Sequence, residues 1–221
     1  MVRQQWLAPV RIGAGAGYEM TPRAWRRLDQ AAERIYRTRT AGWDGNWHLL
    51  VLEPIGERGA RERVRSALSF LGYAPLADNT WLAAYASDEV SAVVDGEGGR
   101  SRAFAARYDA DPQALAQTLW DLDGLAAAYE DWLAQARDMT AGANEGTDDE
   151  TAFAVRSRLV HEWRKFLFTD PGLPRELLPA HWPGEDAAGF FNAEAARLLP
   201  AASRFVDSCL RLTTATDGAL R

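Results

Sequence analysis

Apolar residues recur every three to four positions along much of the second half of the chain, which is the spacing of helices that bury one face. The two clearest helices are predicted at about residues 125–139 and 151–168. Their inward-facing residues are Leu125, Tyr129, Trp132 and Ala136 in the first and Val155, Leu159, Trp163 and Phe166 in the second. Weaker patterns predict helices at about 112–121 and 185–212, so this half is expected to form a helical domain.

Between residues 43 and 108 the pattern alternates between strands and helices. The apolar run at 47–52 is typical of a buried strand, and further strands are expected at about 80–83 and 102–108. Helices are expected between them, at about 61–72 and 89–94. The longer one turns Val64, Leu68 and Leu71 inward, and Gly72 is expected to end it. This alternation predicts a small α/β sandwich of ferredoxin-like type.

The first forty residues predict a hairpin followed by a helix. Short strands near residues 6–12 and 18–20 flank an alternating glycine stretch, Gly13 to Gly17, which is expected to be a flexible tip. Thr21 and Pro22 then form a strong helix start, with threonine as the N-cap and proline at the first helical position. A hairpin and one helix cannot close a core alone, so the segment is expected to be the end of a larger domain.

The composition supports a folded chain with a packed core. Of the 221 residues 47% are hydrophobic and nine are tryptophan, which excludes a globally disordered protein. Cys209 is the single cysteine, so neither a disulfide framework nor a cysteine zinc site is expected. Because the sequence also shows no long apolar stretch and no secretory leader, we expect a soluble, cytoplasmic protein.

The net charge of −6 is unevenly distributed. Residues 1–39 carry +5, which leaves −11 for the remaining 182 residues. A basic segment on an acidic body is typical of a nucleic-acid-binding arm. The arginine preference itself is no evidence for phosphate recognition, because 24 of the 25 basic residues are arginine throughout the chain. The candidate DNA contacts are Arg3, Arg11, Arg23, Arg26 and Arg27.

A polar, acidic stretch at residues 140–150 (TAGANEGTDDE) is the clearest linker. Its last residues, Asp148, Asp149 and Glu150, suit the positive N-terminus of the following helix. We therefore predict an α+β chain in three parts. These are a hairpin and helix at 1–39, a ferredoxin-like middle domain at 40–110 and an α-helical C-terminal domain at 111–221.

Motifs for catalysis or metal binding are weak. The glycines at 13, 15 and 17 do not lead directly into a helix, so a hairpin tip is favoured over a nucleotide loop. His48, His161 and His181 are too scattered for a metal site, and no Ser, Cys or Asp lies in a recognisable nucleophile motif. We expect no enzymatic activity and no metal or other cofactor.

The polar face of the helix at 151–168 carries Arg158, His161, Glu162 and Lys165 within reach of one another. Two interpretations stay open. The residues form ordinary surface ion pairs, or the cations and the histidine receive an anionic ligand.

The same region resembles the C-terminal signature of the PaaX family, repressors of phenylacetic acid degradation operons and their relatives. The matching runs are RLVHEWRKFLF at 158–168, DPGLP at 170–174, ELLP at 176–179 and WPG at 182–184. Upstream, WDGNW at 43–47, the strand around Trp81 and LWDL at 119–122 resemble the middle region of the family. The first forty residues resemble the wing and linking helix of its winged-helix domain, so the resemblance covers essentially the whole chain.

The resemblance implies a transcriptional repressor that dimerises, binds operator DNA and is released by an aryl-CoA thioester such as phenylacetyl-CoA. One departure matters. Family members carry further residues before this start, which hold the first helices of the winged helix and most of its recognition helix. Either the protein begins upstream of Met1, or this chain has lost autonomous operator reading. In the second case it is a stand-alone ligand-sensing or protein-interaction module.

A CoA thioester is a polyanion with an apolar acyl end, so it needs cationic groups for its phosphates and aromatic surface for the acyl group. We expect these groups to line a cleft between the middle and C-terminal domains. The candidate effector-binding residues are Arg158, His161 and Lys165 on one wall, Arg61 and Arg65 on the other, and Trp43 and Trp182 nearby. The alternative is that the family signature serves packing alone.

We expect the 221-residue chain to bind DNA weakly and without sequence preference, because its basic segment lacks an evident recognition helix. Each phosphate contact should lower log K by about 0.9 per unit of log salt concentration. Fluorescence anisotropy with operator and scrambled duplexes over a salt series measures that slope. Glutamine at the five candidate arginines should reduce it. Nanomolar operator binding that is insensitive to scrambling residues 1–39 would contradict this expectation.

Overall fold

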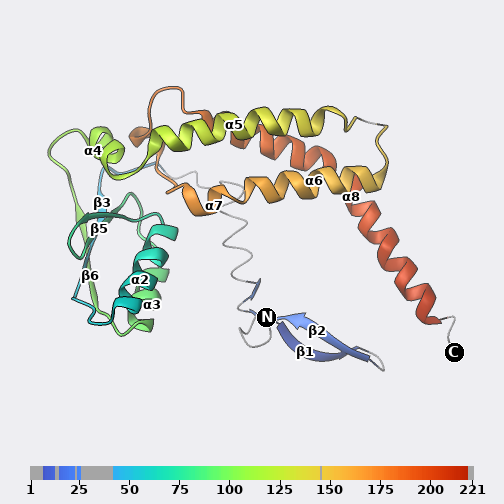
Figure 1. Cartoon of the computed structure of the whole chain (residues 1–221), viewed down its shortest axis with the longest axis horizontal. Helices are drawn as coiled ribbons and strands as arrows, with labels where there is room; N and C mark the ends of the chain where they lie inside the picture. The colour runs from blue at the N-terminus through green and yellow to red at the C-terminus, as the bar shows by residue number, and fades with distance from the viewer. Residues whose placement is uncertain (1–6, 13–14, 23, 26–41, 145, 219–221) are drawn as a thin grey trace. The chain divides into compact units, whose positions relative to one another are not determined.

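The computed structural model describes residues 7–12, 15–22, 24–25, 42–144 and 146–218 (Figure 1). The chain divides into two compact units, Met1–Thr40 and Ala41–Arg221. The second unit contains a small α/β domain and a helical domain. The α+β class predicted from the sequence is therefore confirmed.

The described part of the first unit is an antiparallel hairpin of β1 (Leu7–Ile12) and β2 (Gly15–Met20). The glycine stretch is not all tip, because Gly15 and Gly17 belong to β2 and pair with Ile12 and Val10. Small residues do not prevent a strand when its backbone continues the hydrogen-bonded ladder. After the hairpin, the backbone N–H of Ala24 donates to the Thr21 hydroxyl at 3.2 Å, which confirms the predicted N-cap. The predicted helix beyond Trp25 lies outside the described residues.

The middle domain has the element order β3, α2, β4, β5, α3, β6. The strands are β3 (Trp47–Leu52), β4 (Ala74–Ala77), β5 (Thr80–Ala83) and β6 (Ser101–Ala106), and the helices are α2 (Arg58–Phe70) and α3 (Glu89–Gly96). The spatial order of the strands is β4-β5-β3-β6 and every pair is antiparallel. This βαββαβ arrangement is the ferredoxin-like fold that the sequence predicts.

The sequence pattern does not predict β4. This edge strand has four residues, only Ala74 is buried, and Pro75 has no N–H to give to a ladder. Its register with β5 shifts between Pro75 and Ala77, which leaves Leu76 43% exposed. A short, irregular and exposed edge strand carries almost no alternation of apolar and polar residues.

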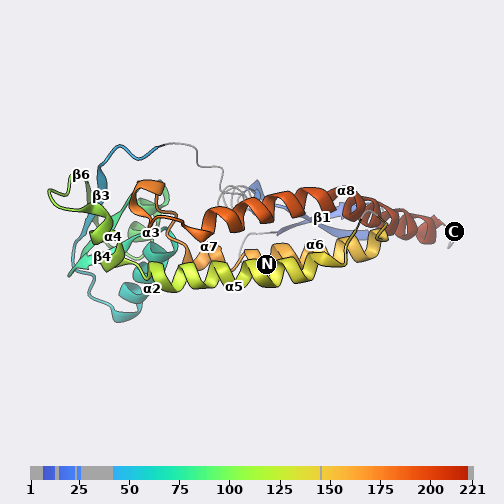
Figure 2. The ribbon, with the colours of Figure 1, turned by 90° about the horizontal axis from the view of Figure 1, so that it is seen from above.

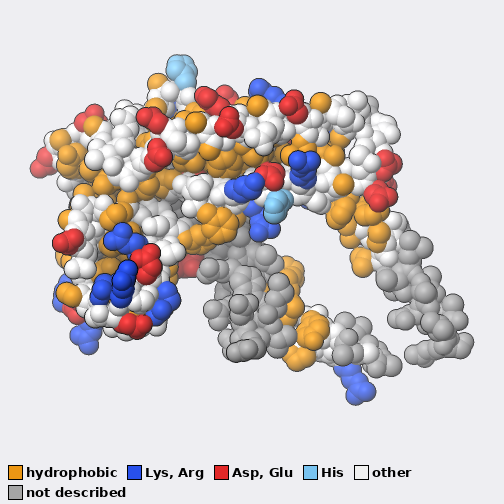
Figure 3. Space-filling view, in the orientation of Figure 1, with side chains coloured by type: hydrophobic (Ala, Val, Ile, Leu, Met, Phe, Trp, Pro, Cys, Tyr) orange, Lys and Arg blue, Asp and Glu red, His pale blue; other side chains and the backbone are white. Residues whose placement is uncertain are grey.

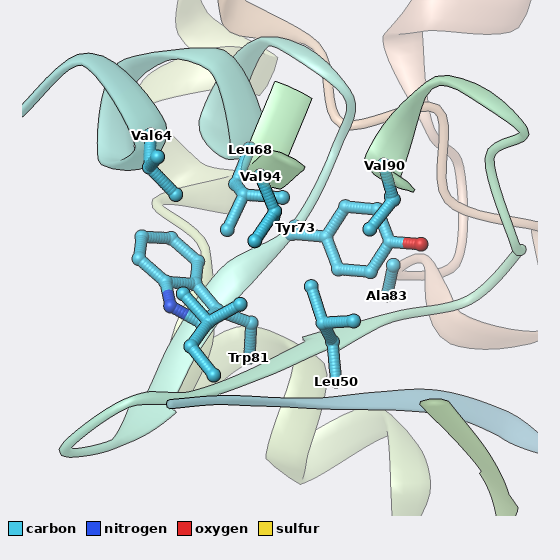
Figure 4. Packing of buried hydrophobic residues seen from close by; sticks show 9 residues of the cluster. Leu50, Val64, Leu68, Tyr73, Trp81, Ala83, Val90 and Val94 are labelled. Carbon is cyan, nitrogen blue, oxygen red and sulfur yellow. The ribbon is translucent and has the colours of Figure 1, made fainter. Parts of the chain in front are cut away.

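The core of the middle domain lies between the sheet and its two helices. Figure 4 shows Val64 and Leu68 of α2, with Val90 and Val94 of α3, directed toward the strands. The sheet contributes Leu50, Leu52, Trp81 and Ala83. Tyr73 closes one end, and its hydroxyl lies 2.7 Å from Nδ1 of His48. Burial lowers the pKa of His48 and raises the pKa of Tyr73, so both stay uncharged near neutral pH.

The helical domain follows the sheet. Its elements are α4 (Pro112–Leu119), α5 (Leu122–Ala141), α6 (Asp149–Trp163), α7 (Phe166–Thr169), the 3-10 helix η1 (Arg175–Leu177) and α8 (Pro183–Gly218). Helices α5, α6 and α8 pack along one another (Figures 1 and 2). The predicted single helix at 151–168 is interrupted after Trp163. There the backbone N–H groups of Lys165 and Leu167 donate to carbonyls three residues back, which tightens the turn.

Aspartates cap the helices of this domain. Asp111, Asp121 and Asp148 accept hydrogen bonds from backbone N–H groups in the first turns of α4, α5 and α6. The hydrogen bonds from Thr151 lower the pKa of Asp148. The acidic end of the predicted linker therefore starts a helix, as expected from its position.

Aromatic rings fill the centre of the helical bundle. Trp163 stacks on Phe191 of α8 with ring centroids 4.8 Å apart and meets Trp132 of α5 edge-on at 4.7 Å. Tyr129 stacks on Phe166 at 4.0 Å. The periodicities that predicted α5 and α6 thus identify the buried faces correctly. Within the described residues, no helix is long and apolar enough to span a membrane.

Pro200 lies inside α8, where its ring interrupts the backbone hydrogen bonding. Nearby, Nε of Arg156 donates to the carbonyl of Ala195 at 3.0 Å. Beyond the proline, Phe205 packs on Phe153 at 5.1 Å and Arg204 pairs with Asp149 at 2.6 Å. These contacts reach the first turn of α6, and α8 continues past that end of the bundle (Figure 1).

Replacing Trp47, Trp81 or Trp163 by alanine should each lower the free energy of unfolding by about 3–5 kcal/mol, because all three are at least 95% buried. Chemical denaturation measures the loss. Phe104→Ala is the control, since this ring is 50% exposed and its loss should change stability by about 0.5 kcal/mol. We expect the melting temperature to be unchanged by dialysis against a chelator. A large drop after metal removal would show that the core does not depend on packing alone.

Candidate functional site

Of the five candidate DNA contacts, the structure describes Arg11. It lies on β1, opposite Ala16 of β2, and its side chain is exposed. Arg3, Arg23, Arg26 and Arg27 lie outside the described residues. An exposed cation on a two-stranded hairpin can reach a phosphate without disturbing any core.

The first pair of predicted effector residues lies on α2. Arg61 and Arg65 are one turn apart and both are exposed. Nη1 of Arg61 donates to the carbonyls of Ile55 and Gly56, at 2.8 and 2.7 Å, and so fixes the loop between β3 and α2. Arg65 makes no hydrogen bond or ion pair within the described part of the chain.

Both arginines line a hollow of about 400 Å³, here called the α2 hollow. Its walls are α2, the end of β3 with the loop that follows, and the hairpin of β4 and β5. No residue of α6 belongs to it.

The second predicted set lies on α6 and around its C-terminal end. Arg158 and His161 are exposed, and Nζ of Lys165 forms an ion pair with Glu162. The pKa of Glu162 is lowered, first by the hydrogen bond from Lys165 and then by the charges of Lys165, His161 and Arg158. The four side chains therefore share one neighbourhood, as their spacing predicts.

The structure does not bring the two cationic sets into one hollow. Figure 3 shows basic side chains over the middle domain and a separate group with a histidine over the helical bundle. Helix α2 meets α7 at its C-terminal end, where the rings of Phe70 and Phe168 are 5.7 Å apart. Arg61 is nine residues earlier in α2, which is about 13 Å along the helix axis.

The two predicted aromatics have different environments. Trp43 is half-buried, meets Trp47 edge-on at 5.2 Å, and its indole N–H donates to the carbonyl of Asn46 at 2.9 Å. Trp182 is 4% exposed and packs against Tyr129 inside the helical domain, with ring centroids 6.1 Å apart. Trp43 thus keeps part of its ring accessible, and Trp182 serves the core.

The DPGLP run forms a junction between the two domains, a role that sequence reasoning left open as a packing alternative. The Tyr129 hydroxyl donates to Asp170, whose other oxygen accepts the backbone N–H of Gly172 at 2.6 Å. At Gly72, where φ is +89°, a Cβ would lie 2.5 Å from the carbonyl oxygen of Pro171. Gly72 therefore does more than end α2, because its missing side chain admits the loop.

One further contact joins the domains, because Trp47 of β3 stacks on Trp120 with ring centroids 6.1 Å apart. Within the helical domain, the Gln113 side chain donates to the carbonyl of Leu178 at 2.5 Å. Two of the segments that resemble the family, DPGLP and LWDL, thus meet the middle domain at this junction.

Comparison with known proteins agrees with that resemblance. Residues 40–117 match the family model described as the PaaX protein central Cas2-like domain, and residues 120–208 match the PaaX-like protein C-terminal domain. The chain is 30% identical over 217 residues to the transcriptional repressor PaaX of Escherichia coli strain K12, covering 92% of this chain and 68% of that protein. The chain belongs to the PaaX family.

A solved structure also resembles this PaaX-family chain. It is the uncharacterized protein Rv0674 from Mycobacterium tuberculosis, with a TM-score of 0.57 and 30% sequence identity. The similarity covers 91% of this chain and 78% of that one.

Gly72→Ala should destabilise the protein more than Gly98→Ala does. Both glycines have positive φ, so each alanine meets backbone strain of about 1–2 kcal/mol. Only at Gly72 would the new Cβ also collide with Pro171, whereas Gly98 has no atom within 4 Å. Denaturant titration of the two variants isolates the contact, and equal losses would show that the loop does not pack closely on Gly72.

Proposed function

We propose that this protein is a transcriptional repressor of an aromatic-acid catabolic operon of the phenylacetate type, and that an aryl-CoA thioester relieves the repression. The 30% identity with the Escherichia coli repressor, across 92% of this chain, carries the proposal. Membership of the PaaX family supports a transcriptional regulator, and the operon and the effector class are the further steps.

The charge distribution supports DNA binding through the first unit. Residues 1–39 carry +5 against −11 for the rest, so phosphates are attracted to one end of the sequence. We propose that Arg11 contacts the DNA backbone together with Arg3, Arg23, Arg26 and Arg27. The protein would act as a homodimer, because paired half-sites in an operator match a two-fold protein.

Both cationic surfaces of the second unit offer groups for an acyl-CoA effector. Arg158 and His161 on α6, with Lys165 beside them, and Arg61 and Arg65 on α2 can each receive phosphate oxygens. Of the two predicted aromatics, Trp43 is the better placed, since Trp182 would reach a ligand only if the core of the helical domain opened.

Deleting the gene in its host should raise the transcripts of an aromatic-acid catabolic operon in the absence of inducer. Phenylacetate should raise the same transcripts in the parent strain and give no further rise in the deletion strain. Quantitative transcript measurement in the four cultures tests both statements. A complementing copy that carries the gene with its own upstream region is the control.

Unchanged transcripts in the deletion strain would overturn the repressor proposal. If the purified chain nevertheless bound phenylacetyl-CoA in calorimetry, a ligand-sensing module without regulatory DNA binding would be the better description. A rise on deletion without any response to phenylacetate would overturn the effector class alone.

A further inference from the structure

The α2 hollow has the chemistry of a site for an amphipathic anion. Resting on the effector class proposed above, we infer that the aryl end of the acyl-CoA enters this hollow and that the CoA phosphates lie along an arginine row on α2. The surface on α6 is then not the primary effector site.

Seven of the eleven residues that line the hollow are apolar, and polar groups contribute the larger share of its exposed surface. Leu52, Val64 and Trp81 line it from the buried core of the middle domain, and each is more than 90% buried. Leu76 lines it from the hairpin and is 43% exposed, so its side chain is accessible to a ligand. A volume of about 400 Å³ lies within the range of small-molecule sites and accommodates an aryl group.

The irregular β4 contributes to this shape. Its register shift between Pro75 and Ala77 places an extra residue, Leu76, outside the ladder. Such bulges redirect side chains at sheet edges. The hairpin then turns through Asn79, whose φ is +56°, and Asp78 and Asn79 complete the lip of the hollow.

Two cations of α2, Arg61 and Arg65, line the hollow. Arg58 lies one turn before Arg61, so the three arginines share one stripe of α2, next to the buried face that contains Val64. The loop carbonyls hold Arg61 in place. Arg58 and Arg65 form no ion pair with any described residue.

The contrast with Arg63 shows that this stripe is not simply a set of surface ion pairs. Arg63 lies on another side of α2 and binds Glu97 through two nitrogens, at 3.0 and 2.7 Å. The Glu97 carboxylate neutralises the guanidinium group of Arg63 and occupies two of its nitrogens, so Arg63 is less available to a ligand. The guanidinium groups of Arg58 and Arg65 have no such partner and are available to phosphate oxygens.

The lip also orients the ligand. Asp78 lines the hollow from the hairpin and repels phosphate, so the polyanionic part of an acyl-CoA would run along α2 and not over the hairpin. The aryl group, at the other end of the molecule, would then lie against the apolar side chains of the hollow, Leu76 among them.

Calorimetry on the 221-residue chain tests the inference with phenylacetyl-CoA, CoA and phenylacetate as separate probes. Arg65→Gln should weaken binding of phenylacetyl-CoA about tenfold, because it removes one charge-assisted contact. Arg100→Gln is the matched control, since this arginine is also exposed and lies outside the hollow, and it should leave binding unchanged.

A second pair of variants tests whether the aryl group enters the hollow. Ala77→Trp adds an indole at an exposed position on the wall of the hollow and should reduce the affinity for phenylacetyl-CoA to that for CoA alone. Ala77→Ser, which keeps the volume small, should bind like the wild type. Circular dichroism and melting temperatures equal to those of the wild type establish that each variant is folded.

Wild-type binding that neither Arg65→Gln nor Ala77→Trp reduces would overturn the inference and leave the proposed function standing. Loss of binding only in Arg158→Gln with His161→Gln would do the same and assign the effector to α6. Phenylacetate binding as tightly as its CoA thioester would overturn the role of the arginine row. Absence of binding in the wild type would overturn the effector class along with the site, while the transcript response to gene deletion tests the repressor itself.

Discussion

The hydrogen bond from Tyr129 to Asp170 fixes the loop through which the helical domain meets the middle domain. Tyr129 is fully buried among the rings that hold α5, α6 and α8 together, and its hydroxyl reaches the first residue of the DPGLP loop. The same carboxylate accepts a hydrogen bond from the backbone N–H of Gly172, which fixes the conformation at the start of the loop. In this conformation the carbonyl of Pro171 lies against Gly72 at the end of α2. A polar contact within an aromatic core thus supports the approach of the loop to α2, alongside the ring contacts of Trp47 with Trp120 and of Phe70 with Phe168.

Much of the fold follows from local patterns in the sequence. The periods of α5 and α6 identify their buried faces, and Thr21 and Asp148 cap helices as their sequence context indicates. β4 could not be found in this way, because four mostly exposed residues with a proline have no repeating pattern. The helix that includes Trp163 also ends without any change in the spacing of apolar residues, so the interruption is visible in the backbone hydrogen bonds and not in the sequence pattern.

The candidate site was predictable in part. The sequence indicates that Arg158, His161 and Lys165 are neighbours because one helix carries them, and the same holds for Arg61 and Arg65. It does not indicate how two helices from different domains face each other, and the hollow beside α2 contains no residue of α6. The burial of Trp182 was not predictable from its sequence context for a different reason. Flanking proline and glycine suggest an exposed loop, but the ring folds back onto Tyr129.

Pro200 divides α8 into two segments that make different packing contacts. Residues before it belong to the aromatic bundle through Phe191. Those after it pack on the start of α6 through Phe205 and Arg204, with Ala201 and Ala202 partly or fully buried. Because the proline interrupts the hydrogen-bond ladder, opening of the last turns need not propagate into the bundle. In native-state hydrogen exchange, amides of the last turns of α8 would exchange through local fraying, while those before Pro200 would exchange when the whole bundle unfolds.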